Sequence, residues 1–105
     1  VKKGLICMKL WIDDVRPAPN GYVWFKTVNE VKEWIGSIEY TYGIELISID
    51  HDAGDYAYDG GDYIRILDWL EETGRNYPIR IHSANIVGVQ NMRRIIQRNG
   101  WKEIY

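Results

Sequence analysis

The chain has 105 residues, of which 46% are hydrophobic and 27% charged, and its formal net charge at pH 7 is −2. One domain is expected, because single cores usually take roughly 100–200 residues. The weakly acidic balance disfavours binding to a long nucleic-acid duplex, while a nucleotide or an RNA end remains compatible with it. No apolar run approaches the roughly 18 residues that a membrane-spanning helix needs. A single cysteine cannot form an internal disulfide and no secretory signal is visible, so we expect a cytoplasmic protein.

The first seven residues, VKKGLIC, precede a methionine at which the strand pattern begins. Lys-Lys-Gly is encoded by purine-rich codons, as a ribosome-binding site is, and Met8 is a suitable initiator. We therefore expect residues 1–7 to be a translated, disordered leader and residues 8–105 to form a single α/β domain.

Short runs rich in β-branched and aromatic residues predict strands along the rest of the chain. They lie at 9–12, 22–26, 45–49 and 78–82, with 101–105 as a terminal strand. The segment VRPAPNG (15–21) predicts a loop between the first two strands, because two prolines and Asn-Gly disfavour regular structure.

Three stretches carry apolar residues at the spacing of a helix. The first begins at Thr27, where Thr-Val-Asn-Glu forms a capping box. The second begins near Tyr63, and the third runs from about residue 86 to residue 99. Glycines are expected to end the three helices: Gly43, Gly74 and Gly100.

This alternation predicts an α/β fold with a parallel sheet and right-handed connections. In such sheets, ligands bind beyond the carboxyl ends of the strands. Polar residues lie at the carboxyl ends of three of the predicted strands: Asp13 and Asp14 at the first, residues 50–52 at the third, and His82 and Ser83 at the fourth. We expect their side chains to meet at one edge of the sheet.

The aspartates at this edge predict a cation site. Asp13, Asp14 and Asp50, with Asp52 as a further candidate ligand, offer the hard oxygen atoms that Mg²⁺ or Mn²⁺ prefers. The later aspartates of the same acidic stretch are expected mainly to shape the loop and to precede the second helix: Asp55, Asp59 and Asp62.

The remaining polar residues suggest proton transfer and phosphate binding. His51 and His82 both follow strand ends, where an imidazole can act as acid or base, with packing or capping as the alternative for each. Ser83 and Asn85 precede the third helix, whose free N–H groups favour an anion, and plain N-capping is the alternative for Asn85. Arg16 is a further candidate for phosphate, or a solvated loop arginine.

Three motifs resemble receiver domains of two-component signalling in order and spacing: WIDD (11–14), ISID (47–50) and IHSA (81–84). In their wider form, LWIDDVRPAP, ISIDHD and IRIHSAN, they are more similar to a divergent offshoot, the cyclic-phosphate processing receiver-like family. The resemblance implies a flavodoxin-like sheet, a magnesium ion held by the acid pair and Asp50, and action on a cyclic phosphate of a nucleotide or RNA end. In a receiver, the residue at Asp50 accepts a phosphoryl group and the hydroxyl at Ser83 senses it.

Two helices of the receiver pattern have no counterpart in this chain. Too few residues separate Asp14 from the second strand for a helix, and the last receiver helix and its preceding lysine have no counterpart, since Lys102 lies within or before the terminal strand. The sheet is thus expected in two or three layers, with one face lacking those two helices. We expect that face to bear Ser48, Arg80 and His82 under aromatic side chains, and to be closed by the 15–21 loop or by a second subunit in a homodimer.

Three functions are compatible with these residues. The leading hypothesis is a small metal-dependent phosphoesterase in which His51 and His82 exchange protons, with Asp50 as an alternative direct nucleophile. The second is a stand-alone receiver that is phosphorylated on Asp50. The third is a non-catalytic module that binds a nucleotide.

Overall fold

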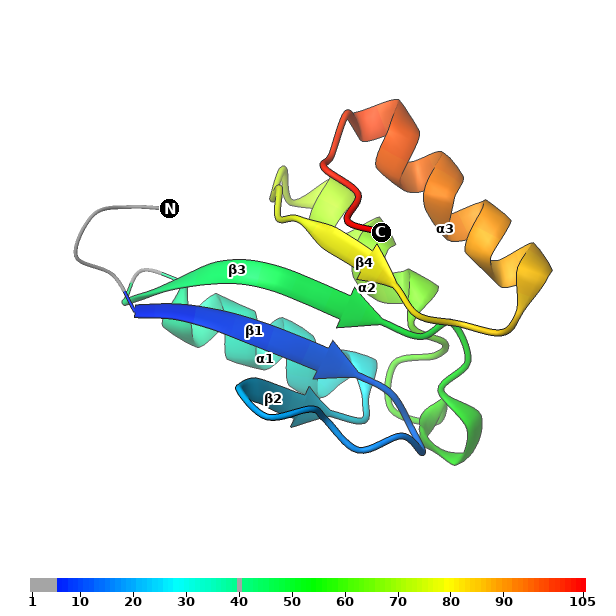
Figure 1. The fold of residues 1–105 in the computed structure, drawn as a ribbon, viewed down its shortest axis with the longest axis horizontal. Helices are drawn as coiled ribbons and strands as arrows, with labels where there is room; N and C mark the ends of the chain where they lie inside the picture. The colour runs from blue at the N-terminus through cyan, green and yellow to red at the C-terminus, as the bar shows by residue number, and fades with distance from the viewer. Residues whose placement is uncertain (1–5, 40) are drawn as a thin grey trace.

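The computed structural model describes residues 6–39 and 41–105, and within these ranges the chain forms a four-stranded sheet and three α-helices (Figure 1). The strands are β1 (Ile6–Ile12), β2 (Tyr22–Phe25), β3 (Tyr42–Ile49) and β4 (Ile79–Ile81). They are all parallel and lie in the order β2-β1-β3-β4. The helices are α1 (Val28–Ile38), α2 (Ile64–Glu72) and α3 (Ile86–Asn99), and a 3₁₀ turn, η1 (Gly54–Tyr56), follows β3. The predicted α/β fold with a parallel sheet is confirmed, and none of the described helices is long and apolar enough to cross a bilayer.

Two strands are longer than the sequence predicted. β1 begins three residues earlier, at Ile6, and β3 begins three residues earlier, at Tyr42, because the first three residues of each strand pair with those of the other. Ile6 and Cys7, which were expected in a disordered leader, therefore form the first two residues of β1. The rest of that leader, residues 1–5, lies outside the described residues.

The helices begin and end close to the predicted positions. The Thr27 hydroxyl accepts a hydrogen bond from the Glu30 N–H, and the Glu30 carboxylate accepts one from the Thr27 N–H, so the predicted capping box is confirmed. Gly100 ends α3 in the left-handed conformation, with φ +66°, as expected. The prediction that Gly43 ends the first helix is wrong: α1 ends at Ile38, and Gly43 lies within β3.

The prediction of a terminal strand at 101–105 is also wrong. This segment makes one isolated parallel bridge to β4, in which the Ile79 N–H donates to the Lys102 carbonyl and the Ile104 N–H donates to the Ile79 carbonyl. Because β4 has only three residues, it offers too short an edge for a longer ladder. Trp101 is 9% exposed and fixes the start of the segment against the core.

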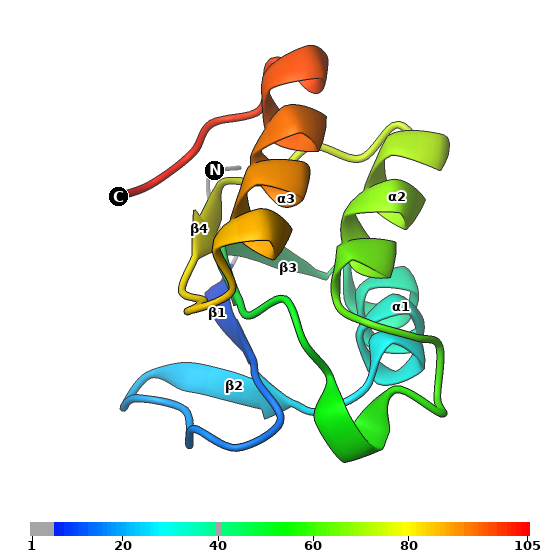
Figure 2. The same cartoon turned by 90° about the vertical axis from the view of Figure 1, so that its right-hand side faces the viewer.

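The helices cover only one face of the sheet, and Figure 2 shows α1, α2 and α3 on the same side of it. Alternate strand residues on that side are buried: Leu10, Ile12, Phe25, Ile47, Ile49 and Ile79. The helices pack three apolar side chains each against them: Val28, Val31 and Ile35 from α1, Ile66, Leu67 and Leu70 from α2, and Met92, Ile95 and Ile96 from α3. Since side chains alternate along a strand, the residues between the buried ones point to the other side. We call this side the open face; its strand residues are Lys9, Trp11, Tyr22, Trp24, Leu46, Ser48 and Arg80.

A β-bulge in β3 maintains this two-sided pattern. The pairing of β1 with β3 passes from Met8–Ile44 to Lys9–Leu46, so Glu45 is an extra residue without a partner on β1. The extra residue keeps Ile44, which is 8% exposed, on the helix-covered side.

The segment between β1 and β2 crosses the carboxyl end of the open face. It contains no helix, as predicted. Its backbone is tied to two indoles, because Trp11 Nε1 donates to the Arg16 carbonyl and Trp24 Nε1 donates to the Asp13 carbonyl, both over 2.8 Å. The loop thus covers one end of the open face, and the rest of that face has no helix over it among the described residues.

The one-sided sheet predicts unequal effects of truncation at adjacent residues of β3. Ile47→Ala removes a fully buried side chain from the core and should lower the free energy of unfolding by about 2–5 kcal/mol. Leu46→Ala truncates a half-buried side chain on the open face and should cost less than about 1.5 kcal/mol. Urea unfolding of both variants at several protein concentrations measures this; equal losses would show that the open face is covered in solution.

Candidate active site at the carboxyl edge of the sheet

Three carboxylates meet where β1 and β3 end. Asp13 and Asp14 directly follow β1, and Asp50 directly follows β3, the neighbouring strand. The Asp50 N–H donates to the Ile12 carbonyl over 2.9 Å, which extends the pairing of the two strands by one residue. One carboxylate oxygen from each of the three aspartates lies within 4.8 Å of the others. The structure therefore brings together the three residues that the sequence predicted as cation ligands.

Asp13 is buried, with 1% exposure, and each of its two carboxylate oxygens accepts two hydrogen bonds. Oδ1 accepts from the N–H groups of Val15 and Arg16, each over 2.9 Å. Oδ2 accepts from Arg16 Nε and His82 Nε2, each over 3.0 Å. Burial opposes ionisation of Asp13, but these donors outweigh it and hold the pKa of Asp13 below its usual range. Since a carboxylate offers about four acceptor positions, Asp13 is saturated.

Asp14 lies in a different environment. Burial raises the pKa of Asp14, and the negative charges of Asp13 and Asp50 raise it further. Gly54, at φ +56°, passes so close that a Cβ there would overlap the Asp14 carboxylate. The backbone of the loop after β3 therefore holds the Asp14 carboxylate close to two other negative charges. A cation would stabilise this arrangement.

The three carboxylates fit a hard divalent cation. Oxygen ligands of this kind suit Mg²⁺ or Mn²⁺, with water or phosphate oxygens completing the coordination. Asp14 and Asp50 would be the direct ligands, while Asp13 would need Arg16 Nε to leave Oδ2 or a water to bridge. Arg16 can move, since its side chain is 53% exposed. Asp52, expected as a further ligand, is not part of this cluster in the described residues.

Arg16 neutralises the acidic cluster from its exposed side. Besides its contacts with Asp13, it donates through Nη2 to the His82 carbonyl over 2.7 Å, and Nη2 lies 3.5 Å from Asp50 Oδ2. The residue predicted to hold phosphate is therefore bound to carboxylates and a carbonyl.

His82 lies behind the cluster on the open face, with a side chain that is 10% exposed. Its Nδ1 lies 2.8 Å from the hydroxyl of the fully buried Ser48, and its Nε2 bonds to Asp13. The ring stacks on Trp11, with centroids 3.8 Å apart and planes 5° from parallel. Burial lowers the pKa of His82, although the Asp13 carboxylate opposes this. A neutral ring that accepts from Ser48 and donates to Asp13 satisfies both nitrogens and orients the carboxylate.

His51 has a free ring nitrogen, unlike His82. Its Nδ1 lies 2.8 Å from Asp52 Oδ1, and this hydrogen bond, against some burial, holds the pKa of Asp52 below its usual range. The ring packs so closely on α3 that a Cβ at Gly88 would overlap it. Nε2 has no hydrogen-bond partner in the part of the chain that the structure describes, yet no buried polar atom there lacks one. Nε2 therefore faces solvent, on a ring that the Asp52 carboxylate holds in place.

Asn85 joins this dyad to the start of α3. Its Oδ1 caps the helix by accepting from the Gly88 N–H over 2.9 Å, and its Nδ2 donates to Asp52 Oδ2 over 3.2 Å. Ser83 Oγ in turn accepts from the Asn85 N–H over 3.2 Å. N-capping, one of the two interpretations of Asn85, is thus observed, and the same amide fixes the Asp52 carboxylate.

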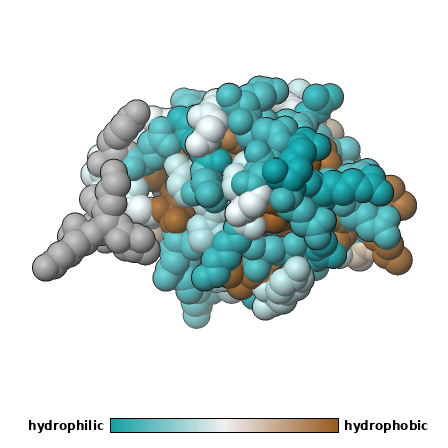
Figure 3. Space-filling view, turned by 90° about the horizontal axis from the view of Figure 1, so that it is seen from above, coloured by the Kyte–Doolittle hydropathy of each residue, from teal (hydrophilic) through white to brown (hydrophobic). Residues whose placement is uncertain are grey.

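An apolar rim borders the edge at the start of α3. Ile86 is 74% exposed and Val87 is 66% exposed. Figure 3 shows hydrophobic atoms gathered at the end of the molecule where α3 begins in Figure 1. The polar site therefore has an apolar surface on one side.

Two of the three later aspartates, Asp59 and Asp62, make hydrogen bonds that shape the loop, as predicted. Asp62 Oδ1 accepts from the Ala53 N–H, and Asp59 Oδ1 accepts from Asn29 Nδ2, each over 3.0 Å. None of the aspartates lies in the first turn of α2. The acidic stretch is therefore folded onto its own backbone and the start of α1, and leaves Asp50 to the cation cluster.

Several residues of the site were not found from the sequence. Trp24 binds the Asp13 backbone, and Trp11 supports His82; the strand alternation that placed Ser48 on the open face also places these tryptophans there. Gly54 and Gly88 allow the loop and α3 to approach Asp14 and His51. No sequence signal marks such approaches, because they depend on how distant segments pack.

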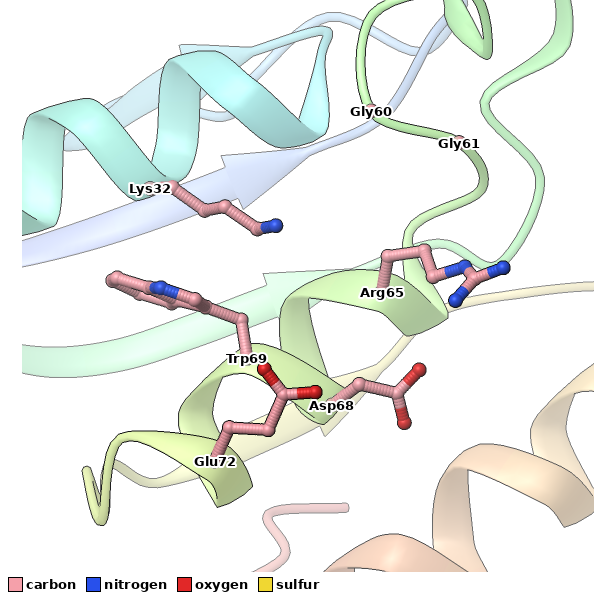
Figure 4. Close-up of a pocket in the computed structure, with 7 residues that line it drawn as sticks. All are labelled: Lys32, Gly60, Gly61, Arg65, Asp68, Trp69 and Glu72. Atoms are coloured by element: carbon pink, nitrogen blue, oxygen red, sulfur yellow. The ribbon is translucent and has the colours of Figure 1, made fainter.

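A hollow among the described residues lies away from this edge. It has a volume of about 400 Å³ and lies between α1, the loop before α2 and α2 itself (Figure 4). Its lining combines cations and carboxylates with one tryptophan and two glycines: Lys32, Gly60, Gly61, Arg65, Asp68, Trp69 and Glu72. None of the predicted site residues lines it, so the carboxyl edge remains the candidate site.

Comparison with known proteins identifies the family of the chain. A family model described as "Cyclic-phosphate processing Receiver domain" matches residues 8–98, a range that includes every residue of the carboxyl-edge site. The chain belongs to this family. No curated protein and no solved structure matches it.

The packing of His51 on α3 predicts a specific sensitivity at Gly88. Gly88→Ala should displace the His51 ring, shift its NMR resonances and weaken its hydrogen bond to Asp52, because the new methyl group would occupy the ring's position. Gly36→Ala in α1 is the matched control: nothing lies near its Cβ position, and alanine there should stabilise the helix by about 0.5–1 kcal/mol. Unchanged His51 resonances in Gly88→Ala would contradict the described site.

Proposed function

We propose that this member of the cyclic-phosphate processing receiver family is a small metal-dependent phosphoesterase that opens a cyclic phosphate on a nucleotide or RNA end. The observation that carries the proposal is the orientation of His51. Its Nδ1 is held by Asp52 and its Nε2 faces solvent, at the sheet edge that also bears three converging carboxylates. A positioned base beside a cation site is what hydrolysis of a phosphodiester requires.

The carboxylates provide the binding half of the site. Asp14 and Asp50 would hold Mg²⁺ or Mn²⁺, joined by Asp13 once Arg16 has left Oδ2. When bound, the cation neutralises phosphate oxygens and makes phosphorus more open to attack. Arg16 is then free to bind a phosphate oxygen, which gives it the phosphate-binding role that its sequence position suggested.

The His51–Asp52 dyad provides the proton transfer. Water attacks phosphorus and forms a new P–O bond, while Nε2 of His51 accepts the proton that the water loses. The bond from phosphorus to one ribose oxygen breaks, and the same proton returns to that oxygen, so that a phosphate monoester is the product. The Asp52 carboxylate stabilises the imidazolium that exists between the two transfers.

His82 takes a different role in this proposal from the one the sequence suggested. Both its ring nitrogens are hydrogen-bonded, and it lies behind Asp13 on the open face. We assign it as a positioning residue that keeps Asp13 ionised and oriented. Replacing it should therefore weaken cation binding rather than remove the base.

Phosphorus NMR of a 2′,3′-cyclic nucleotide incubated with the protein and Mg²⁺ or Mn²⁺ tests the proposal. The cyclic resonance should convert to a monoester resonance. His51→Ala should slow this conversion by about 10²–10⁴-fold, the usual contribution of a positioned base. Asp14→Asn should abolish the conversion. Asp68 is a carboxylate on α2 that lines the distant hollow, and Asp68→Asn should leave the rate unchanged.

Two other outcomes would contradict the proposal and identify what replaces it. A cyclic resonance that shifts or broadens without conversion would indicate a binding module without catalysis. Stable labelling of Asp50 by an acyl-phosphate donor, with no conversion of the cyclic nucleotide, would indicate a signalling receiver.

A further inference from the structure

The open face carries a row of side chains that spans the sheet. Trp24, Trp11, Ser48 and Arg80 are partners in the parallel register of β2, β1, β3 and β4. In the next row, Tyr22 and Leu46 flank Lys9. Outside the loop that crosses its carboxyl end, this face bears three aromatic side chains and has no helix over it among the described residues.

The charges in the paired rows of this face are of one sign. Its charged strand residues are Lys9 and Arg80, and Lys26 follows the end of β2 with its ammonium 4.6 Å from the centre of the Trp24 ring. None of these three cations forms an ion pair in the described part of the chain. The chain as a whole has a net charge of −2, so the open face is positive against the overall balance.

The aromatic side chains remain accessible. Trp24 is 36% exposed, and Trp11 and Tyr22 are half-buried and meet edge to face, with centroids 5.8 Å apart. Stacking of a nucleobase on such a ring contributes about 1–3 kcal/mol and tolerates any base. A sheet face with aromatic rings and cations is a common platform for single-stranded nucleic acid.

The open face is continuous with the acidic site. Trp24 donates to the Asp13 carbonyl, and Trp11 stacks on His82, which bonds the Asp13 carboxylate. A chain lying on the face would therefore have its end beside the three carboxylates.

A second copy of the protein fits the face less well. Two open faces packed together would bring Lys9 and Arg80 of one copy near cations of the other, with no carboxylate in the paired rows of the face to pair with them. Like charges brought together at an interface cost several kcal/mol. A duplex also fits poorly, since its bases are not free to stack on the rings.

We propose that the open face binds a short single-stranded RNA, so that the substrate is the cyclic-phosphate end of an RNA chain rather than a free nucleotide. That the bound chain is RNA with a cyclic phosphate at its end rests on the proposed function, because a 2′,3′-cyclic phosphate forms only on a ribose that has its 2′ oxygen. The binding itself depends only on the open face. Bases stack on Trp24 and its neighbours, and phosphates pair with Lys9, Lys26 and Arg80.

The test is fluorescence anisotropy of a labelled ten-nucleotide RNA with an ordinary 3′-hydroxyl, measured without divalent cations. The wild-type protein should bind it with an affinity that falls as salt rises. Trp24→Ala should weaken binding at least tenfold, and Arg80→Ala should reduce the slope of log K against log salt by about 0.7–1. Arg65→Ala, an exposed cation of α2 on the helix side, is the matched control and should change neither quantity.

Failure here is distinguishable from failure of the proposed function. RNA that does not bind, or that binds equally to wild type, Trp24→Ala and Arg80→Ala, overturns the inference even if a cyclic mononucleotide is hydrolysed. Binding that depends on both residues supports it even if no hydrolysis occurs. A dimer in sedimentation that Arg80→Glu leaves intact and Trp24→Ala dissociates would also overturn it, because the face would then be an interface between copies.

Discussion

The repulsion among three carboxylates is the constraint on which the rest of the structure depends. Parallel pairing of β1 with β3 delivers Asp13, Asp14 and Asp50 to one place, and their charges must be balanced there. Four donors bind Asp13, two of them from the side chains of Arg16 and His82, whereas the pKa of Asp14 is raised. A site arranged in this way keeps one carboxylate ionised and oriented, and holds another beside like charges, where a cation would stabilise it.

The direct connection between β1 and β2 has consequences for both halves of the molecule. Without a helix there, none of the described helices covers the open face, and polar side chains can lie on it. Ser48 and His82 use this freedom to build a hydrogen-bonded support behind Asp13, sealed by the Trp11 ring. The same missing helix leaves the rest of the face to Trp24, Arg80 and their neighbours. The support of the acidic site and the proposed RNA platform therefore have one structural origin.

Much of the architecture follows from the sequence because the signals are local. The capping box at Thr27 and the glycine at 100 bracket helices where the structure has them, and alternation in the strands predicts the one-sided sheet. The early start of β1 and β3 was missed because it depends on their mutual pairing. The terminal strand was predicted from composition, but the three residues of β4 give it no edge.

The candidate site likewise has a part that the sequence predicts and a part that depends on packing. Only the strand order was needed to place Asp13, Asp14 and Asp50 together, and the alternation of strands and helices along the chain supplies that order. The separate roles of the two histidines were out of reach, because side-chain direction at a strand end is decided by packing. His82 turns to Ser48 and Asp13, whereas His51 turns to Asp52 and lies on Gly88. The family match over residues 8–98 places the chain among cyclic-phosphate processing receivers, and the chemistry proposed for it depends on this difference.

The most direct test of the account is the affinity of the protein for Mn²⁺, measured by electron paramagnetic resonance of the free ion. The three converging carboxylates predict one site per chain, an affinity at least tenfold weaker in both Asp14→Asn and Asp50→Asn, and no change in Asp68→Asn. Binding that is absent, or that is equally strong in all three variants, would contradict it, because the three carboxylates at the ends of β1 and β3 would then not form a cation site.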